Sequence, residues 1–182
     1  MIDDAPGLAG GGDAADPAGI RFRRPTEADY PAIGSVIDEW WGGRKLHLLL
    51  PRLWLQHFTG TSWVAEAEDA PEDRALAGFL VGFLSPDRPA EAYCHMIATN
   101  PNLRQRGIGR GLYERFFADA RAAGRSRVMA VTWPGNRLSI AFHRAMGFEV
   151  QDGPGTQNLY GTPAYPGYDL EDEDRAVLVR TL

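Results

Sequence analysis

The chain has 182 residues, of which 44% are hydrophobic and 24% charged, as is ordinary for one soluble globular domain. A net charge of −5 argues against nucleic acid as a partner. Cys94 is the single cysteine, so an internal disulfide and a cysteine-based metal cage are excluded, and we expect no metal. No apolar run reaches the roughly 18 residues of a membrane span, and the start lacks a signal-peptide pattern. We expect a cytoplasmic protein with no membrane partner.

Residues 1–18 are rich in Gly, Ala, Asp and Pro and predict a flexible tail, because they offer little to bury. A single domain is expected from 19 to 182. Alternation of apolar residues and flanking turn residues predict its strands. These lie at 20–24, 62–66, 75–84, 90–99, 127–132, 148–150 and 176–180.

Helical spacing of apolar residues predicts the helices between these strands. They start after Thr26 and run over 45–58, 109–123 and 137–146. Pro51 should interrupt or begin the second helix, because proline cannot donate a helical hydrogen bond. The stretch 151–174, rich in Gly, Pro, Tyr and acidic residues, predicts a long loop. Strands mixed with helices in this order predict an α/β domain in which helices cover a sheet.

The segment from Thr99 to Tyr113 carries the strongest functional signal. A predicted strand ends, a glycine-bearing loop follows, and a helix opens directly after it. Amides at a helix start lack intrahelical partners and lie at the positive end of the helix dipole, so they suit a phosphate group. Gly107 and Gly109 allow close backbone approach, and three arginines add positive charge. These arginines are Arg104, Arg106 and Arg110.

Other phosphate motifs fit this segment less well. A dinucleotide fingerprint requires a glycine at position 112, which is leucine, and a Walker A loop requires a Gly-Lys-Ser/Thr sequence that is absent. A plain glycine-rich turn before an ordinary helix is the remaining alternative.

Two segments together resemble the GNAT superfamily of N-acetyltransferases. The first is Arg104-x-x-Gly107-x-Gly109 after a strand, and the second, in order along the chain, is Asn136-x-x-Ser139-x-x-Phe142-His143-x-x-x-Gly147-Phe148. The resemblance implies a GNAT fold, in which a mostly antiparallel mixed sheet of six to seven strands carries helices on both faces. It also implies an enzyme that moves an acetyl group from acetyl-CoA to an amine by direct attack in a ternary complex.

The resemblance implies a set of cofactor-binding residues. Loop amides of the family hold the CoA pyrophosphate, and they map to Gln105, Arg106, Gly107, Ile108, Gly109 and Arg110, with Arg104 opening the motif. Backbone groups that pair with the pantetheine arm map to Ile97, Ala98 and Thr99. Asn136 would bond the same arm, or act as a helix N-cap, and the two roles are compatible.

The family commonly carries a tyrosine, as proton donor to the departing thiolate, where this chain has His143. Histidine could fill that role, because it exchanges protons near neutral pH. Alternatively it packs under the cofactor while water supplies the proton. A late tyrosine could also substitute: Tyr160, Tyr165 or Tyr168.

The base that deprotonates the amine is expected on the strand over 90–99. Tyr93 stands where some family members carry a glutamate, and His95, two residues on, should share its strand face. We expect His95 to act directly or through water, with a hydrogen-bonded structural histidine as the alternative. Cys94 should face the other way, which argues against an acetyl-cysteine intermediate.

An acceptor wall is expected at the end of the first helix. Trp40 and Trp41, followed by Arg44, could form an aromatic platform, or the tryptophans could be core residues. The Tyr-rich late loop favours a closed pocket and therefore a small-molecule amine. A protein amine and a non-catalytic acyl-CoA sensor remain open alternatives, and a homodimer is expected from the family alone.

Overall fold

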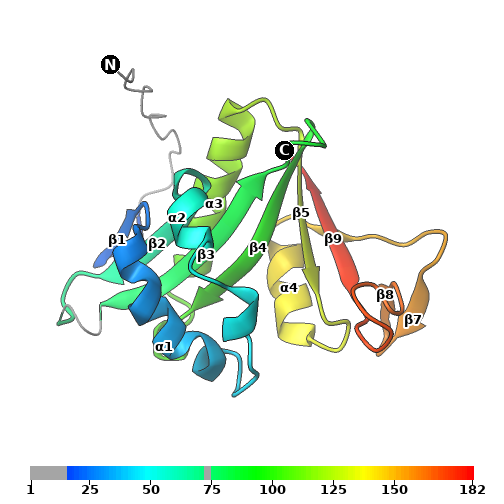
Figure 1. Ribbon diagram of the computed structural model, residues 1–182, viewed down its shortest axis with the longest axis horizontal. Coiled ribbons are helices and arrows are strands. Elements are labelled where there is room, and N and C mark those ends of the chain that lie inside the picture. The colour runs from blue at the N-terminus through cyan, green and yellow to red at the C-terminus, as the bar shows by residue number, and fades with distance from the viewer. Residues whose placement is uncertain (1–15, 72–74) are drawn as a thin grey trace. The chain divides into compact units, whose positions relative to one another are not determined.

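The structure, a computed structural model, describes residues 16–71 and 75–182 (Figure 1). Seven strands form one sheet in the order β1-β2-β3-β4-β5-β9-β6, and β7 and β8 form a separate hairpin. The strands are β1 (Ile20–Arg23), β2 (Trp63–Ala67), β3 (Leu76–Leu84), β4 (Glu91–Thr99), β5 (Arg127–Thr132), β6 (Glu149–Val150), β7 (Gln157–Leu159), β8 (Thr162–Ala164) and β9 (Ala176–Thr181). The predicted mixed α/β class and strand number are confirmed.

Four α-helices accompany the sheet in the described residues. They are α1 (Tyr30–Trp40), α2 (Trp54–His57), α3 (Ile108–Ala122) and α4 (Arg137–Ala145). The break expected within 45–58 is confirmed, because a 3-10 helix at His47–Leu49 precedes Pro51 and the one-turn α2 follows it. Pro51 separates the two pieces, as expected of a residue without an amide hydrogen.

The chain forms two compact units. The first contains the residues up to Val81 together with Met96–Gly124, and the second contains Gly82–His95 and Arg125–Leu182.

In the first unit, helices cover both faces of the strands. β1–β2 and β2–β3 pair antiparallel, with α1 and α2 in front and α3 behind (Figure 1). The core on the α1 side is a buried cluster: Ile33, Ile37, Leu50, Leu55, Phe79, Val81, Met96 and Ala98. On the α3 side, Gly78 keeps the packing close, because a Cβ there would lie 2.9 Å from the Ala98 carbonyl oxygen and 3.0 Å from Ile108.

In the second unit, β5 runs parallel to β4 and antiparallel to β9, which also pairs antiparallel with β6. Arg180 of β9 donates to the Met146 carbonyl at the end of α4. The predicted long loop over 151–174 is wrong in its middle, where β7 and β8 pair from Gln157↔Ala164 to Leu159↔Thr162. Each strand has three residues, too few to show an alternating pattern in the sequence.

Three expectations concern the N-terminal tail, membrane-spanning helices and metal ligands. Of the predicted tail, residues 1–15 lie outside the described residues. Within the described part of the chain, no helix is long and apolar enough to cross a membrane. Over the same residues, no three His, Cys, Asp or Glu side chains are grouped so that they could hold a metal ion.

Candidate functional site

The loop between β4 and α3 has the geometry expected of an anion site. Gly107 is the N-cap of α3 with a φ of +78°, and Gln105 has a φ of +65°. The amide of Gly111 is the first to bond within the helix, to the Gly107 carbonyl at 2.9 Å. The amides of the three residues between Gly107 and Gly111 therefore lack an intrahelical acceptor. They lie at the positive end of a 15-residue helix. Left-handed residues interspersed in such a loop create an anion-binding concavity.

Gly111, the third glycine of the segment from Thr99 to Tyr113, has a different role. A Cβ at Gly111 would overlap the ring of Phe22 on β1. Gly111 is buried on the inner face of α3, so its lack of a side chain sets the distance between α3 and the sheet.

The three arginines of the loop differ in their surroundings. Arg106 donates from Nη2 to the Ala18 carbonyl at 2.9 Å, so its guanidinium holds the segment before β1. Arg110 lies 3.9 Å from Glu114 on the helix surface, and Arg104 is exposed. All three are exposed at the surface near the loop.

The residues expected to pair with a pantetheine arm lie at the end of β4. Ile97 and Thr99 are half-buried, whereas Ala98 is 8% exposed and packs in the core cluster. The ladder between β4 and β5, in the described residues, runs from Glu91↔Arg127 to Tyr93↔Met129. Ile97, Ala98 and Thr99 therefore come four to six residues after Tyr93, the last β4 residue of this ladder.

His143, the candidate acid, is buried on α4 and only 4% exposed. Its Nδ1 lies 2.8 Å from the Ser139 carbonyl oxygen, which can only accept, so Nδ1 carries the proton. The rings of Phe142 and Phe148 meet it edge-on, at 5.5 and 5.2 Å between centroids. Burial lowers the pKa of His143, and the bond to Ser139 opposes this only in part. The neutral imidazole is favoured, with its lone pair on Nε2.

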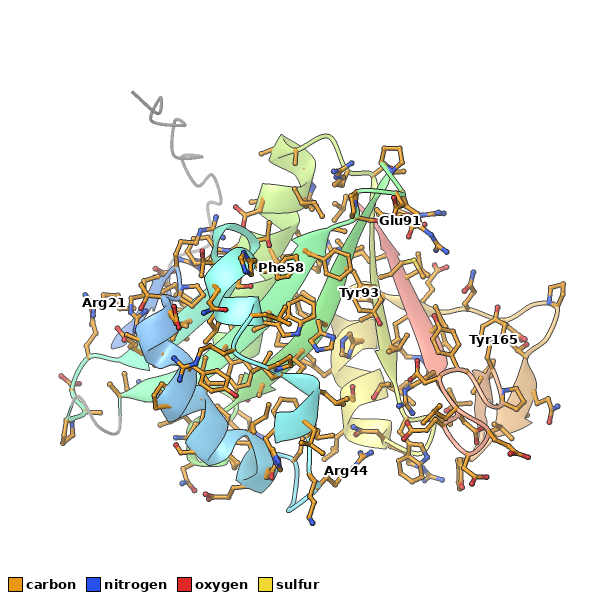
Figure 2. The ribbon with its side chains drawn as sticks, in the orientation of Figure 1. Arg21, Arg44, Phe58, Glu91, Tyr93 and Tyr165 are labelled. Atoms are coloured by element: carbon orange, nitrogen blue, oxygen red, sulfur yellow. The ribbon has the colours of Figure 1, made fainter. Side chains whose placement is uncertain are left out.

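Tyr93 and His95, the candidates for the base, are half-buried on β4. The Tyr93 ring lies 5.5 Å from that of Phe83, and its side chain projects from β4 in Figure 2. Burial, and then the proximity of Tyr168, raises the pKa of the Tyr93 phenol well above its ordinary value. A phenol that holds its proton so firmly is a poor base at neutral pH. Cys94 between them is buried at 3% exposure.

Asn136 is the N-cap of α4, because its side-chain oxygen accepts from the Ser139 amide at 3.1 Å. The N-cap role expected for Asn136 is therefore present. Its amide NH2 group is not needed for the cap.

The predicted acceptor residues divide into two kinds. Trp40 and Trp41 pack on Phe79, with centroids 6.2 and 6.1 Å apart, and belong to the margin of the core cluster. Arg44 is exposed in the loop after α1 (Figure 2). Packing on Phe79 favours the core alternative for both tryptophans.

A pair that the sequence did not reveal holds this same loop. Asp38 accepts from the amides of Leu46 and His47 at 2.8 and 2.9 Å, and its second oxygen lies 2.6 Å from the His47 Nδ1. Desolvation alone would raise the pKa of Asp38. The hydrogen bonds, led by that of the His47 side chain, outweigh it and lower the pKa below its ordinary value. No short-range spacing signals such a contact across nine residues.

Comparison with known proteins identifies the family. The model of the acetyltransferase (GNAT) family matches residues 28–148, which is more than half of the chain. The chain belongs to this family.

Three relatives illustrate the similarity. An L-2,4-diaminobutyric acid acetyltransferase from Nocardia farcinica is 31% identical over 122 residues, which cover 64% of this chain and 61% of that protein. The match therefore spans about three fifths of that relative's length. Ard1 from Thermoplasma volcanium has a TM-score of 0.69 at 17% identity and covers 91% of this chain and 99% of its own.

The third is the diaminobutyrate acetyltransferase EctA from Paenibacillus lautus, solved with L-2,4-diaminobutyric acid and coenzyme A. It has a TM-score of 0.61 at 20% identity and covers 88% of this chain and 93% of its own. At such identities the two solved structures establish a shared fold.

Proposed function

We propose that this chain transfers the acetyl group of acetyl-CoA to a primary amine of a small molecule, by direct attack within a ternary complex. The observation that carries the proposal is the loop between β4 and α3, with its left-handed Gly107 and its free first-turn amides. Such amides suit the pyrophosphate of CoA, which would be held by Gln105, Arg106, Gly107, Ile108, Gly109 and Arg110.

A small acceptor is supported by the relative from Nocardia farcinica, whose name gives L-2,4-diaminobutyric acid as its substrate. Acceptors with an amino-acid skeleton and a second amine are therefore the first to test. Tyr93 and His95, both half-buried, precede on β4 the residues proposed for the pantetheine arm.

Proton transfer is assigned to groups other than the Tyr93 phenol and the buried His143. His95, directly or through a water, takes the proton of the amine. A neutral His143 with its proton on Nδ1 is buried on α4, and water or a late tyrosine protonates the thiolate.

The direct test is thiol release from acetyl-CoA over a panel of amines that includes L-2,4-diaminobutyric acid, lysine and a protein N-terminal peptide. We expect release with the diamino acids, at least tenfold above the rate without acceptor. Acetyl-CoA binding with no release for any amine would instead support the sensor function.

Variants separate the proton-transfer roles. His95→Gln should remove the acid limb of the rate-versus-pH profile and leave the dissociation constant of acetyl-CoA unchanged. An unaltered profile would remove His95 from the mechanism, and loss of the basic limb in His143→Phe would reassign the proton donor to His143.

A further inference from the structure

Two exposed aromatic rings meet in the second unit, at the end of β5. Trp133 follows β5 directly, and Tyr160 lies in the turn between β7 and β8. Their centroids are 5.1 Å apart and their planes are tilted by 55°. Trp133 is 39% exposed and Tyr160 61%. Two large rings that meet at the surface form one contiguous aromatic patch, unlike single exposed side chains, which are normal on protein surfaces.

Tyr160 is held at a cost in backbone energy. The two turn residues, Tyr160 and Gly161, have φ values of +56° and +82°, between the paired residues Leu159 and Thr162. A two-residue turn with both φ values positive strongly prefers Asn, Asp or Gly at its first position. A bulky residue in that conformation is strained, and such strain concentrates at functional positions.

The Trp133 ring is fixed by a different contact, with the backbone of Gly135. A Cβ at Gly135 would overlap three atoms of the indole ring, so the ring lies directly on the glycine backbone. The Asn136 amide donates to the Trp133 carbonyl at 2.9 Å and closes the turn beneath the ring. Two independent backbone features therefore fix the two rings.

The segment that carries Tyr160 is acidic. Residues 151–174 contain no Lys, Arg or His, and they carry six acidic residues: Asp152, Asp169, Glu171, Asp172, Glu173 and Asp174. Arg175 pairs with Asp169 at 2.8 Å and with Glu173, which leaves a net negative segment. An anion such as a CoA phosphate is disfavoured there, whereas a cation is favoured both by this charge and by the ring faces.

We infer that Trp133 and Tyr160 form a subsite for a cationic ammonium group of the acceptor. The inference rests on the proposed function and narrows its substrate class to molecules with two amino groups. One amine must be neutral to attack the thioester, while the other keeps its proton and binds over the exposed ring faces. A monoamine lacks the group that this subsite recognises.

The subsite is tested by binding, independently of turnover. The probe is tetramethylammonium chloride, compared with neutral tert-butanol and with sodium chloride, and the readout is the indole N–H signal of Trp133 in the NMR spectrum of the full chain. Trp133→Leu assigns the signal. We expect a saturable shift with tetramethylammonium alone, and no shift or an equal shift with tert-butanol would overturn the inference.

Two variants of Tyr160 make a matched pair. Tyr160→Phe keeps the ring and should bind the probe as the parent does. Tyr160→Asn removes the ring but suits the left-handed turn, so its dissociation constant should rise about two- to fivefold while its melting temperature rises. Unchanged binding by Tyr160→Asn would overturn the inference, and its higher stability excludes unfolding as the cause of any loss.

Kinetics connect the subsite to the acceptor. In Tyr160→Asn, KM should rise for diamines and not for monoamines or acetyl-CoA. Equal effects on diamines and monoamines would overturn the acceptor assignment. Absence of acetyl transfer with any amine, together with intact tetramethylammonium binding, would instead count against the proposed function.

Discussion

At the scale of single residues, burial decides what the imidazole of His143 can do. The side chain is 4% exposed and its Nδ1 is bonded to a helix carbonyl, so a second proton would have to enter an apolar site between two phenylalanine rings. The same position in an exposed setting would suit a proton donor. Residue type alone therefore could not distinguish a donor from a packing residue, because the difference lies in the neighbours.

His143 should make folding stability depend on pH. Its folded pKa lies below the unfolded value of 6.5, so the unfolded state binds the proton more readily. Its contribution is fully present above 6.5 and is lost as the pH falls from 6.5 through the lower folded value. His143→Phe should flatten this slope in urea unfolding between about pH 7.5 and 5. The exposed His57→Gln is the control, and parallel slopes for His143→Phe and the parent would contradict the account.

At the scale of elements, one carboxylate ties α3 to β2 and to Arg24, the residue that follows β1. The carboxylate of Asp119 on α3 accepts hydrogen bonds from both terminal nitrogens of Arg24, at 2.7 and 2.6 Å. It also accepts one from the Trp63 indole N–H at 2.8 Å. Asp119 is 5% exposed, and the Arg24 guanidinium lies 3.7 Å from the centre of the Trp63 ring. This cluster holds the helix whose start is proposed to bind the CoA pyrophosphate.

Removing that carboxylate should destabilise the fold. Asp119→Ala leaves the charge of Arg24 and the Trp63 N–H partly buried without their partner, which should cost about 2–4 kcal/mol. Glu114→Ala on the same helix removes only the 3.9 Å surface pair with Arg110 and should cost under about 0.5 kcal/mol. Urea denaturation measures both, and equal losses would show that the cluster is not what anchors α3.

The sequence predicted those elements whose patterns are long. The strands β3 and β4 and the helix α3 span nine or more residues with clear periodicity and stop signals, and they form where expected. The β7–β8 hairpin escaped prediction because its strands are short and because Tyr160 occupies a turn position that normally carries Asn, Asp or Gly. The hydrogen-bonded pair of Asp38 and His47 was not predicted, because it depends on how the loop after α1 folds back.

At the scale of the whole molecule, the order of strands and helices along the chain was sufficient to predict a sheet covered by helices. The glycine-bearing loop before α3 could also be predicted, because its glycines and its place before a helix follow from local backbone requirements. The contact between Trp133 and Tyr160 could not be predicted, because the two residues come from segments 27 residues apart and meet only in the folded second unit.

The central claim is that the start of α3 binds acetyl-CoA, and calorimetric titration of two glycine variants tests it most directly. Gly107→Ala and Gly124→Ala place a Cβ on left-handed residues at opposite ends of the same helix, with φ values of +78° and +72°. Each should cost about 1 kcal/mol of stability.

Only Gly107→Ala obstructs the loop amides. We predict a dissociation constant for acetyl-CoA at least tenfold above that of the parent for Gly107→Ala, and within twofold of it for Gly124→Ala. Equal affinities in the two variants, or no binding by the parent chain, would contradict the account.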